Sequence, residues 1–172
     1  MKVATGFAIG NRAEPELAAL AVASAMRKAD INSPACVLLF LTSEFASNPQ
    51  SAIKAAAKVA RCTNIIGCSA MGIFTEEDWV IDSPAAAAMV FSDPLFSKPA
   101  LSQASFSQQK LFVSNNSEPL LLTLTAPNAV DTRWLNPNQT GNNPLRFGGV
   151  SGDAIGHGPF SIWQNADRKS VV

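Results

Sequence analysis

The run Cys36–Leu41, which reads Cys-Val-Leu-Leu-Phe-Leu, restricts the possible folds of this chain more than any other feature. Every position in the run is apolar, which is typical of a β-strand that is covered on both faces. Amphipathic patterns on either side of it predict helices over about residues 14–29 and 50–60. We therefore expect Cys36–Leu41 to be a central strand, and we expect both helices to pack on the same sheet.

Two more strands are predicted around these helices, one over residues 3–9 and one where a β-branched run leads into Gly67. The order strand, helix, strand, helix, strand favours parallel neighbours and right-handed crossovers, so two N-terminal β-α-β units are predicted. The apolar residues expected to face inward are Leu17, Leu20 and Ala21 in the first helix and Ile53, Ala56 and Ala60 in the second.

The later part of the chain is predicted to be mostly β. Residues 85–91 contain an alanine run that favours a helix intrinsically. Prolines at 84 and 94 leave little room for one, so a strand is predicted instead. Further strands are expected within 104–113, 119–125 and 159–164, with a long irregular loop over 126–145 that holds one helical turn near Trp134. The predicted fold class is α+β, with a mixed sheet and the helices packed on it.

Composition excludes several classes of function. Thirteen basic and thirteen acidic side chains cancel, so no basic field is available to bind nucleic acid. No apolar run approaches the roughly 20 residues of a membrane-spanning helix. The three cysteines, Cys36, Cys62 and Cys68, are irregularly spaced, which indicates reduced thiols in a cytoplasmic protein. A single histidine and the lack of a close cysteine pair argue against zinc, and no cofactor is predicted.

Two glycine segments carry the predicted binding site: the first is Gly67–Gly72 (Gly-Cys-Ser-Ala-Met-Gly) and the second is Gly148–Asp153 (Gly-Gly-Val-Ser-Gly-Asp). Both are interpreted as turns that follow strands and leave backbone N–H groups open at the edge of a sheet. We expect them to meet at one end of the sheet and to frame a shared pocket for a small molecule that bears an ammonium or carboxylate group. The candidate ligand-binding residues are Gly67, Cys68, Ser69, Gly72, Gly148, Gly149, Ser151, Gly152 and Asp153.

Two alternatives use other chemistry. Cys68 is a candidate nucleophile, for which His157 is the one available histidine partner. His157 is also a candidate axial ligand for haem. A buried thiol at position 68 and a solvated loop histidine at position 157 explain both residues more simply. No complete catalytic constellation is visible, so the chain is predicted not to be an enzyme.

The two glycine segments, their order and the strand Phe160–Trp163 before Gln164-Asn165 resemble the N-terminal domain of the FIST family of intracellular signal-transduction sensors. The resemblance covers nearly the whole chain. It implies a cytoplasmic sensory domain that binds a small ligand, with amino acids a suggested class. It also implies a partner, either a FIST C-terminal domain or a downstream signalling protein, and a few relatives bind haem.

The chain departs from the family pattern in two respects. Ile73 stands where the family usually has a glutamate after the first turn, and the C-terminal companion domain is absent. Residues 1–172 are therefore interpreted as one N-terminal-like domain, incomplete at its C-terminus. Because the chain ends in the strand-like Ser170–Val172, we expect an unpaired sheet edge or exposed apolar surface near that end.

Overall fold

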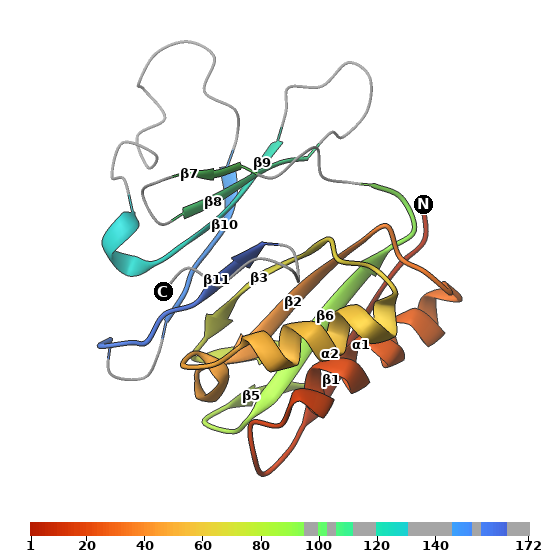
Figure 1. Ribbon diagram of the computed structural model, residues 1–172, viewed down its shortest axis with the longest axis horizontal. Coiled ribbons are helices and arrows are strands. Elements are labelled where there is room, and N and C mark those ends of the chain that lie inside the picture. The colour runs from red at the N-terminus through yellow and green to blue at the C-terminus, as the bar shows by residue number, and fades with distance from the viewer. Residues whose placement is uncertain (95–99, 103–105, 112–119, 131–145, 153–155, 165–172) are drawn as a thin grey trace.

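The computed structural model describes residues 1–94, 100–102, 106–111, 120–130, 146–152 and 156–164. A five-stranded sheet forms its centre, with the strand order β1-β6-β2-β3-β11. Its strands are β1 (Val3–Ile9), β6 (Ala85–Phe91), β2 (Cys36–Thr42), β3 (Ile65–Ala70) and β11 (Ile162–Gln164). The run that reads as a strand covered on both faces is therefore central, as predicted (Figure 1).

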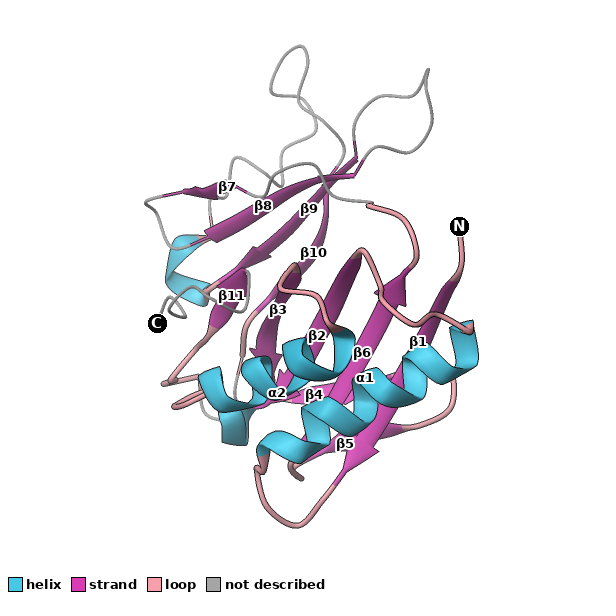
Figure 2. Cartoon of the chain, turned by 45° about the vertical axis from the view of Figure 1, so that its right-hand side comes forward, coloured by secondary structure: helices cyan, strands magenta, loops and turns pink. Residues whose placement is uncertain are grey.

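Helices α1 (Pro15–Ala29) and α2 (Gln50–Ala60) lie side by side on one face of this sheet (Figure 2). Pro15 suits the first turn of α1, where its missing N–H removes no hydrogen bond, and Arg27 and Lys28 lie in the last turn near the negative end of the helix dipole. The helices bury small side chains against Val37, Leu39 and other strand residues on this face. At Gly6 a Cβ atom would collide with the Ala21 carbonyl, so α1 lies almost against the backbone of β1.

The opposite face of the sheet is covered by two β structures. The first is a four-stranded sheet of order β10-β9-β8-β7, in which β9 (Leu120–Thr125) buries Leu122 and Leu124 against Ile66 and Cys68. The second is the hairpin β4 (Gly72–Phe74) with β5 (Trp79–Ile81). The remaining strands are β7 (Ala100–Ser102), β8 (Phe106–Leu111) and β10 (Arg146–Val150), and two short 3-10 turns, η1 (Ser43–Phe45) and η2 (Pro127–Ala129), complete the described elements. The fold is α+β, as predicted, and both faces of the central sheet are buried.

The alanine run forms the strand β6, as predicted, but its place in the sheet was not foreseen. It lies between β1 and β2 and pairs antiparallel with both. The expectation that β1 and β2 are parallel neighbours is therefore wrong, whereas β2 and β3 do pair in parallel around α2. Small side chains suit this position because Ala86 and Ala88 face the helices while Ala85 and Ala87 face the hairpin. Tertiary packing decides the conformation here against the helix preference of alanine.

The predicted helix faces are confirmed except at Leu20, which is 59% exposed. On α2, Ile53, Ala56 and Ala60 are buried, whereas the cationic side chains of Lys54, Lys58 and Arg61 are exposed. Trp134, most of the loop over 126–145 and the terminal Ser170–Val172 lie outside the described residues. Within the described part, β11 forms one edge of the central sheet and β1 forms the other.

Candidate functional site

The two glycine segments are largely strands rather than turns, which corrects the sequence interpretation. Strand β3 continues through Ala70 and β4 begins at Gly72, so Met71 is the one residue between them. Gly148 and Gly149 lie inside β10, which pairs in parallel with β9. Gly67 and Gly148 allow close contacts between neighbouring strands rather than reversal of the chain.

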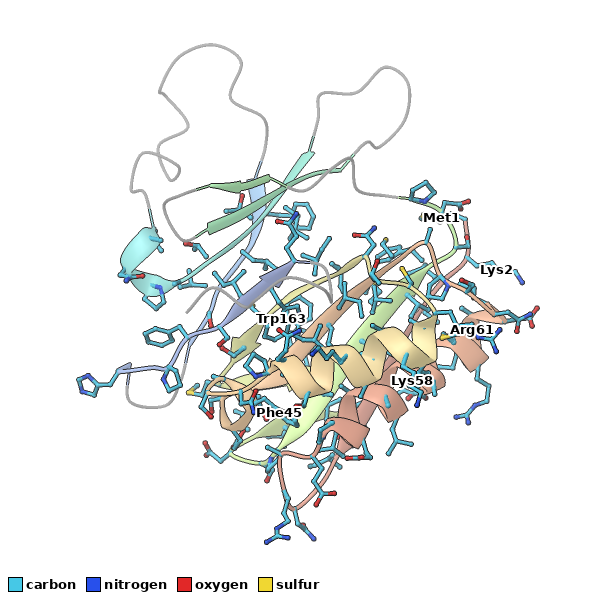
Figure 3. The ribbon with its side chains drawn as sticks, in the orientation of Figure 1. Met1, Lys2, Phe45, Lys58, Arg61 and Trp163 are labelled. Carbon is cyan, nitrogen blue, oxygen red and sulfur yellow. The ribbon has the colours of Figure 1, made fainter. Side chains whose placement is uncertain are left out.

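Gly67 makes room for a buried tryptophan. It pairs with Leu39 on one side and with Trp163 on the other. A Cβ atom at position 67 would overlap the Leu39 carbonyl and would lie 2.8 Å from Trp163 Nε1. Trp163 is 1% exposed and belongs to the same buried cluster as Phe45 (Figure 3). The first glycine therefore serves the packing of β3 between its neighbours.

Three buried serines join the two glycine segments. The segments meet, as predicted, but not at one end of a single sheet, because β3 belongs to the central sheet and β10 to the four-stranded one. The hydroxyl oxygens of Ser69 and Ser151 lie 2.8 Å apart, although they are 82 positions apart in the chain. The Ser161 N–H donates to Ser69 Oγ at 3.0 Å, and the Ser161 hydroxyl donates to the Ala46 carbonyl. The Ser151 N–H donates to the Thr125 carbonyl at 2.8 Å. We call Ser69, Ser151 and Ser161 the serine junction; it ties β3 and the start of β11 to the end of β10.

The serine junction is closed to solvent, since all three residues are 0% exposed. Its hydroxyls already have partners, which buried polar groups require. The partners of Ser69 Oγ are a second hydroxyl, a backbone N–H and a carbonyl. None of these is a general base, so the geometry does not activate Ser69 as a nucleophile. The junction holds the two segments together, and a ligand would meet the residues around it rather than the hydroxyls themselves.

The second glycine segment is open on one side. At Gly148, with φ of +145°, a Cβ atom would overlap the Thr123 carbonyl. At Gly149 and Gly152, by contrast, no atom of the described residues lies within 4 Å of a Cβ position. Phe147 and Val150 beside them are 42% and 50% exposed, and β10 is an edge strand of its sheet. This edge thus presents accessible backbone between two exposed apolar side chains.

The other predicted site residues are placed as follows. Gly72 is half-buried at the start of β4, and Asp153 lies outside the described residues. His157 is exposed. The described residues contain no group of three histidine, cysteine, aspartate or glutamate side chains placed to hold a metal ion.

Cys68 is a buried, protonated thiol. Burial raises its pKa to about 12, and its side chain packs among Ile66, Phe91 and Leu122. The thiolate is the reactive form of cysteine, so this environment disfavours nucleophilic chemistry at neutral pH. All three cysteines are free.

Alkylation tests this placement. At pH 8, iodoacetamide should modify Cys68 in the folded protein about 1,000-fold more slowly than in urea, because raising the pKa from 9.0 to about 12 lowers the thiolate fraction by that factor. Mass spectrometry of the digested protein resolves the rate at each cysteine, with the half-buried Cys62 as the internal comparison. Equal rates at Cys68 in the folded and unfolded protein would contradict the buried thiol.

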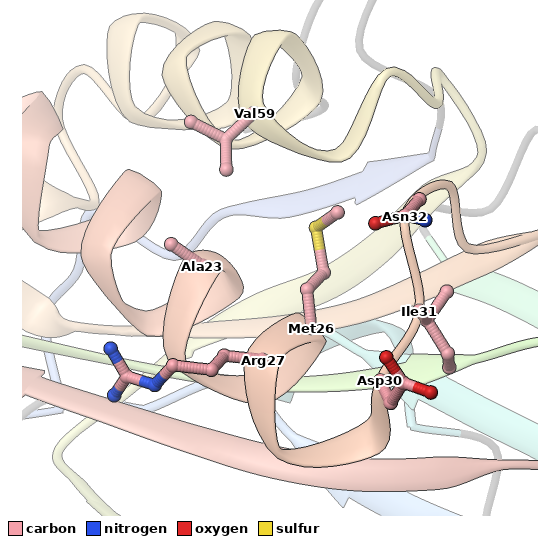
Figure 4. A pocket seen from close by; sticks show the side chains of 7 residues that line it. All are labelled: Ala23, Met26, Arg27, Asp30, Ile31, Asn32 and Val59. Carbon is pink, nitrogen blue, oxygen red and sulfur yellow. The ribbon is translucent and has the colours of Figure 1, made fainter.

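Two cavities lie at the helices, away from the glycine segments. One of about 340 Å³ is lined by Ala23, Met26, Arg27, Asp30, Ile31, Asn32 and Val59, and one of about 380 Å³ by Ala13, Pro15, Glu44, Phe45, Ser47, Asn48, Ser51 and Ala52. Figure 4 shows Met26 between Arg27 and Asp30, with Val59 of α2 facing them. Both cavities are near the lower end of the range for small-molecule sites, roughly 300–1,000 Å³. The sequence does not predict these cavities, because each is lined by residues from separate segments, such as Ala23 of α1 and Val59 of α2.

None of the helices in the described part of the chain is long and apolar enough to span a membrane.

Comparison with known proteins identifies the family. No curated protein and no solved structure matches the chain significantly. The model of the FIST N domain family matches residues 35–171, a span that includes β2, α2, both glycine segments and β11. Since this match covers well over half of the 172 residues, the chain belongs to the FIST N domain family, a family of sensory domains in signal transduction.

Proposed function

We propose that this FIST N domain senses a small polar metabolite, with an amino acid as the leading class, in a cytoplasmic signalling protein. The ligand lies against the open side of β10, at Gly149 and Gly152. A FIST C-terminal domain or a downstream signalling protein receives the signal. The observation that carries the proposal is that no atom of the described residues lies within 4 Å of a Cβ position at these two glycines, whereas the Cβ position at the neighbouring Gly148 overlaps the Thr123 carbonyl.

The surroundings of β10 support this proposal. An exposed strand edge offers N–H donors and carbonyl acceptors to a polar ligand, and glycine lets that ligand approach the backbone closely. Phe147 and Val150 add apolar contacts. Asp153 follows directly and is the candidate partner for a ligand ammonium group. The serine junction connects this strand to the central sheet through hydrogen bonds. A ligand that shifts β10 would therefore also shift β3 and β11.

The buried thiol of Cys68 supports a binding role over the thiol-enzyme alternative. No feature of the described residues favours haem, whose candidate ligand His157 is exposed.

A thermal-shift screen over amino acids, nucleotides and haem tests the proposal. A ligand that binds the folded state at 100 times its Kd adds about 2.7 kcal/mol to the free energy of unfolding, so a true ligand should raise the Tm by several degrees. The variant Gly149→Val should lose this shift, because its side chain occupies the proposed position of the ligand. It should leave the Tm of the free protein nearly unchanged, because no atom in the described part of the chain lies within 4 Å of the added Cβ.

The control is a valine at an exposed site between α2 and β3, Thr63→Val, which should keep the full ligand-induced shift. Equal stabilisation of the wild-type protein and Gly149→Val by the same ligand would place the ligand elsewhere. Failure of every compound to stabilise the wild-type protein would contradict binding of these ligand classes.

A further inference from the structure

The hairpin β4–β5 has one buried face and one exposed aromatic face. Ile73 and Val80 pair across the hairpin, are 5% and 7% exposed, and pack against Ala85 and Ala87 of β6. Side chains alternate between the faces of a strand, so the neighbouring residues point the other way. Those residues are strongly exposed: Phe74 is 80% exposed and its cross-strand partner Trp79 is 68% exposed. Ile81, two residues after Trp79 on the same strand, extends the surface at 47% exposure.

We call Phe74, Trp79 and Ile81 the hairpin face. Tryptophan and phenylalanine bury large areas when they pack, and one apolar pair, Ile73 with Val80, already anchors this hairpin to the sheet. Scattered exposed apolar residues are normal on a protein surface, but a contiguous patch of large ones is typical of an interaction site. Aromatic residues are also enriched at protein–protein interfaces.

Carboxylates border the hairpin face. Glu76, Glu77 and Asp78 form the turn between the two strands, Asp82 follows Ile81 at the other end, and all four are exposed. Lys28 of α1 pairs with Glu76 and Glu77, and Thr5 of β1 donates a hydrogen bond to Glu76. This hydrogen bond also lowers the pKa of the Glu76 carboxyl.

These contacts hold the turn against the edge of β1, so the hairpin face is fixed in place. With one lysine against four carboxylates, the border keeps a negative charge.

We propose that the hairpin face docks a segment of a partner protein in which arginine or lysine side chains alternate with apolar ones. The apolar side chains cover Ile81, and the cationic groups stack on Trp79 and Phe74 while they pair with the bordering carboxylates. Charge selects this occupant. A second copy of the chain would bring two negative borders together, and an anionic membrane surface would be repelled by the same carboxylates.

A fluorescein-labelled peptide of alternating leucine and arginine is the probe, with fluorescence anisotropy as the measurement. Trp79→Ser should weaken binding at least tenfold, since an aromatic residue central to an interface carries a large share of the affinity. Asp78→Asn should weaken binding about two- to fivefold and flatten its dependence on salt. This change removes the charge and can keep the 2.8 Å hydrogen bond from the Trp79 N–H to the Asp78 side chain. Leu20→Ser is the matched control, because Leu20 is a 59% exposed apolar residue on α1.

Unchanged urea midpoints confirm that each variant is folded, and Phe74→Ser replaces Trp79→Ser should that variant unfold. The proposal is overturned if the wild-type protein does not bind the peptide, if Leu20→Ser weakens binding as much as Trp79→Ser, or if a leucine–glutamate peptide binds equally well. A concentration-dependent dimer in sedimentation that Trp79→Ser abolishes would assign the face to a second copy and overturn it as well.

Discussion

The variant Gly67→Ala should lower the free energy of unfolding by about 3 kcal/mol, the upper part of the range for overpacked interiors. The added methyl group would overlap the Leu39 carbonyl and press on the indole of Trp163. Relief requires β3 to move away from β2 or β11, which breaks strand pairing at the centre of the sheet. Urea unfolding followed by circular dichroism measures the change.

Gly149→Ala is the control for this effect because it adds the same atoms to the interior of a strand. Among the residues that the structure describes, no atom lies within 4 Å of its Cβ position, so its free energy of unfolding should match that of the wild-type protein within about 0.5 kcal/mol. The comparison separates steric overlap from the general effect of removing a glycine. Similar stabilities of the two variants would show that the space at Gly67 is not needed for packing.

The variant Trp163→Ala should lower the free energy of unfolding by about 3–5 kcal/mol, the range for truncation of a large buried aromatic residue. Trp163 is 1% exposed and packs in the cluster that joins α1 and α2 to the central sheet. Its loss leaves a cavity between β11 and the helices, and the rigid backbone at Gly67 cannot fill it. Urea unfolding gives the free energy, and a lower Tm in calorimetry should accompany it.

Trp79→Ala provides the matched comparison, since it deletes the same side chain from a site that is 68% exposed. Its free energy of unfolding should stay within about 0.5 kcal/mol of the wild-type value. A loss at Trp79 as large as that at Trp163 would mean that the hairpin face is part of the stabilising core, which would also count against its role as a docking surface.

Hydrophobic patterning predicted the parts of the fold that depend on burial. The uniformly apolar Cys36–Leu41 is central because one set of its side chains meets the helices and the other meets the second sheet. Proline placement around the alanine run correctly excluded a helix there. The prediction that Leu20 faces inward is wrong. A helical pattern does not define which residues at the border of the apolar face are buried, and Leu20 lies outside the buried residues of α1.

The glycine segments show that one sequence does not distinguish the different structural reasons for a glycine. A glycine in a turn and a glycine under a neighbouring carbonyl look the same in one sequence, so Gly67 and Gly148 were assigned to turns although they lie in strands. The prediction placed both serines at one end of a single sheet, whereas Ser69 lies within β3 of the central sheet and Ser151 follows β10 of the four-stranded sheet. Only the proximity of the two segments could be predicted. The burial of the two serines could not, since it depends on Ser161 and on the four-stranded sheet above. The position of β6 between β1 and β2 depends on contacts between distant parts of the chain, which a local sequence pattern does not determine.

The serine junction has a consequence for the order of folding. Ser69 and Ser161 are 92 positions apart and Ser69 and Ser151 are 82 apart, so the junction closes very large loops. Contacts of such separation form slowly, because the entropy of loop closure is lost before the contact stabilises the chain. On the ribosome, β1 to β6 with both helices can associate before residue 161 is synthesised. Until β7 to β10 are also synthesised, the part of the central sheet that packs against β9 is uncovered, and we expect a chaperone to be needed most at this stage.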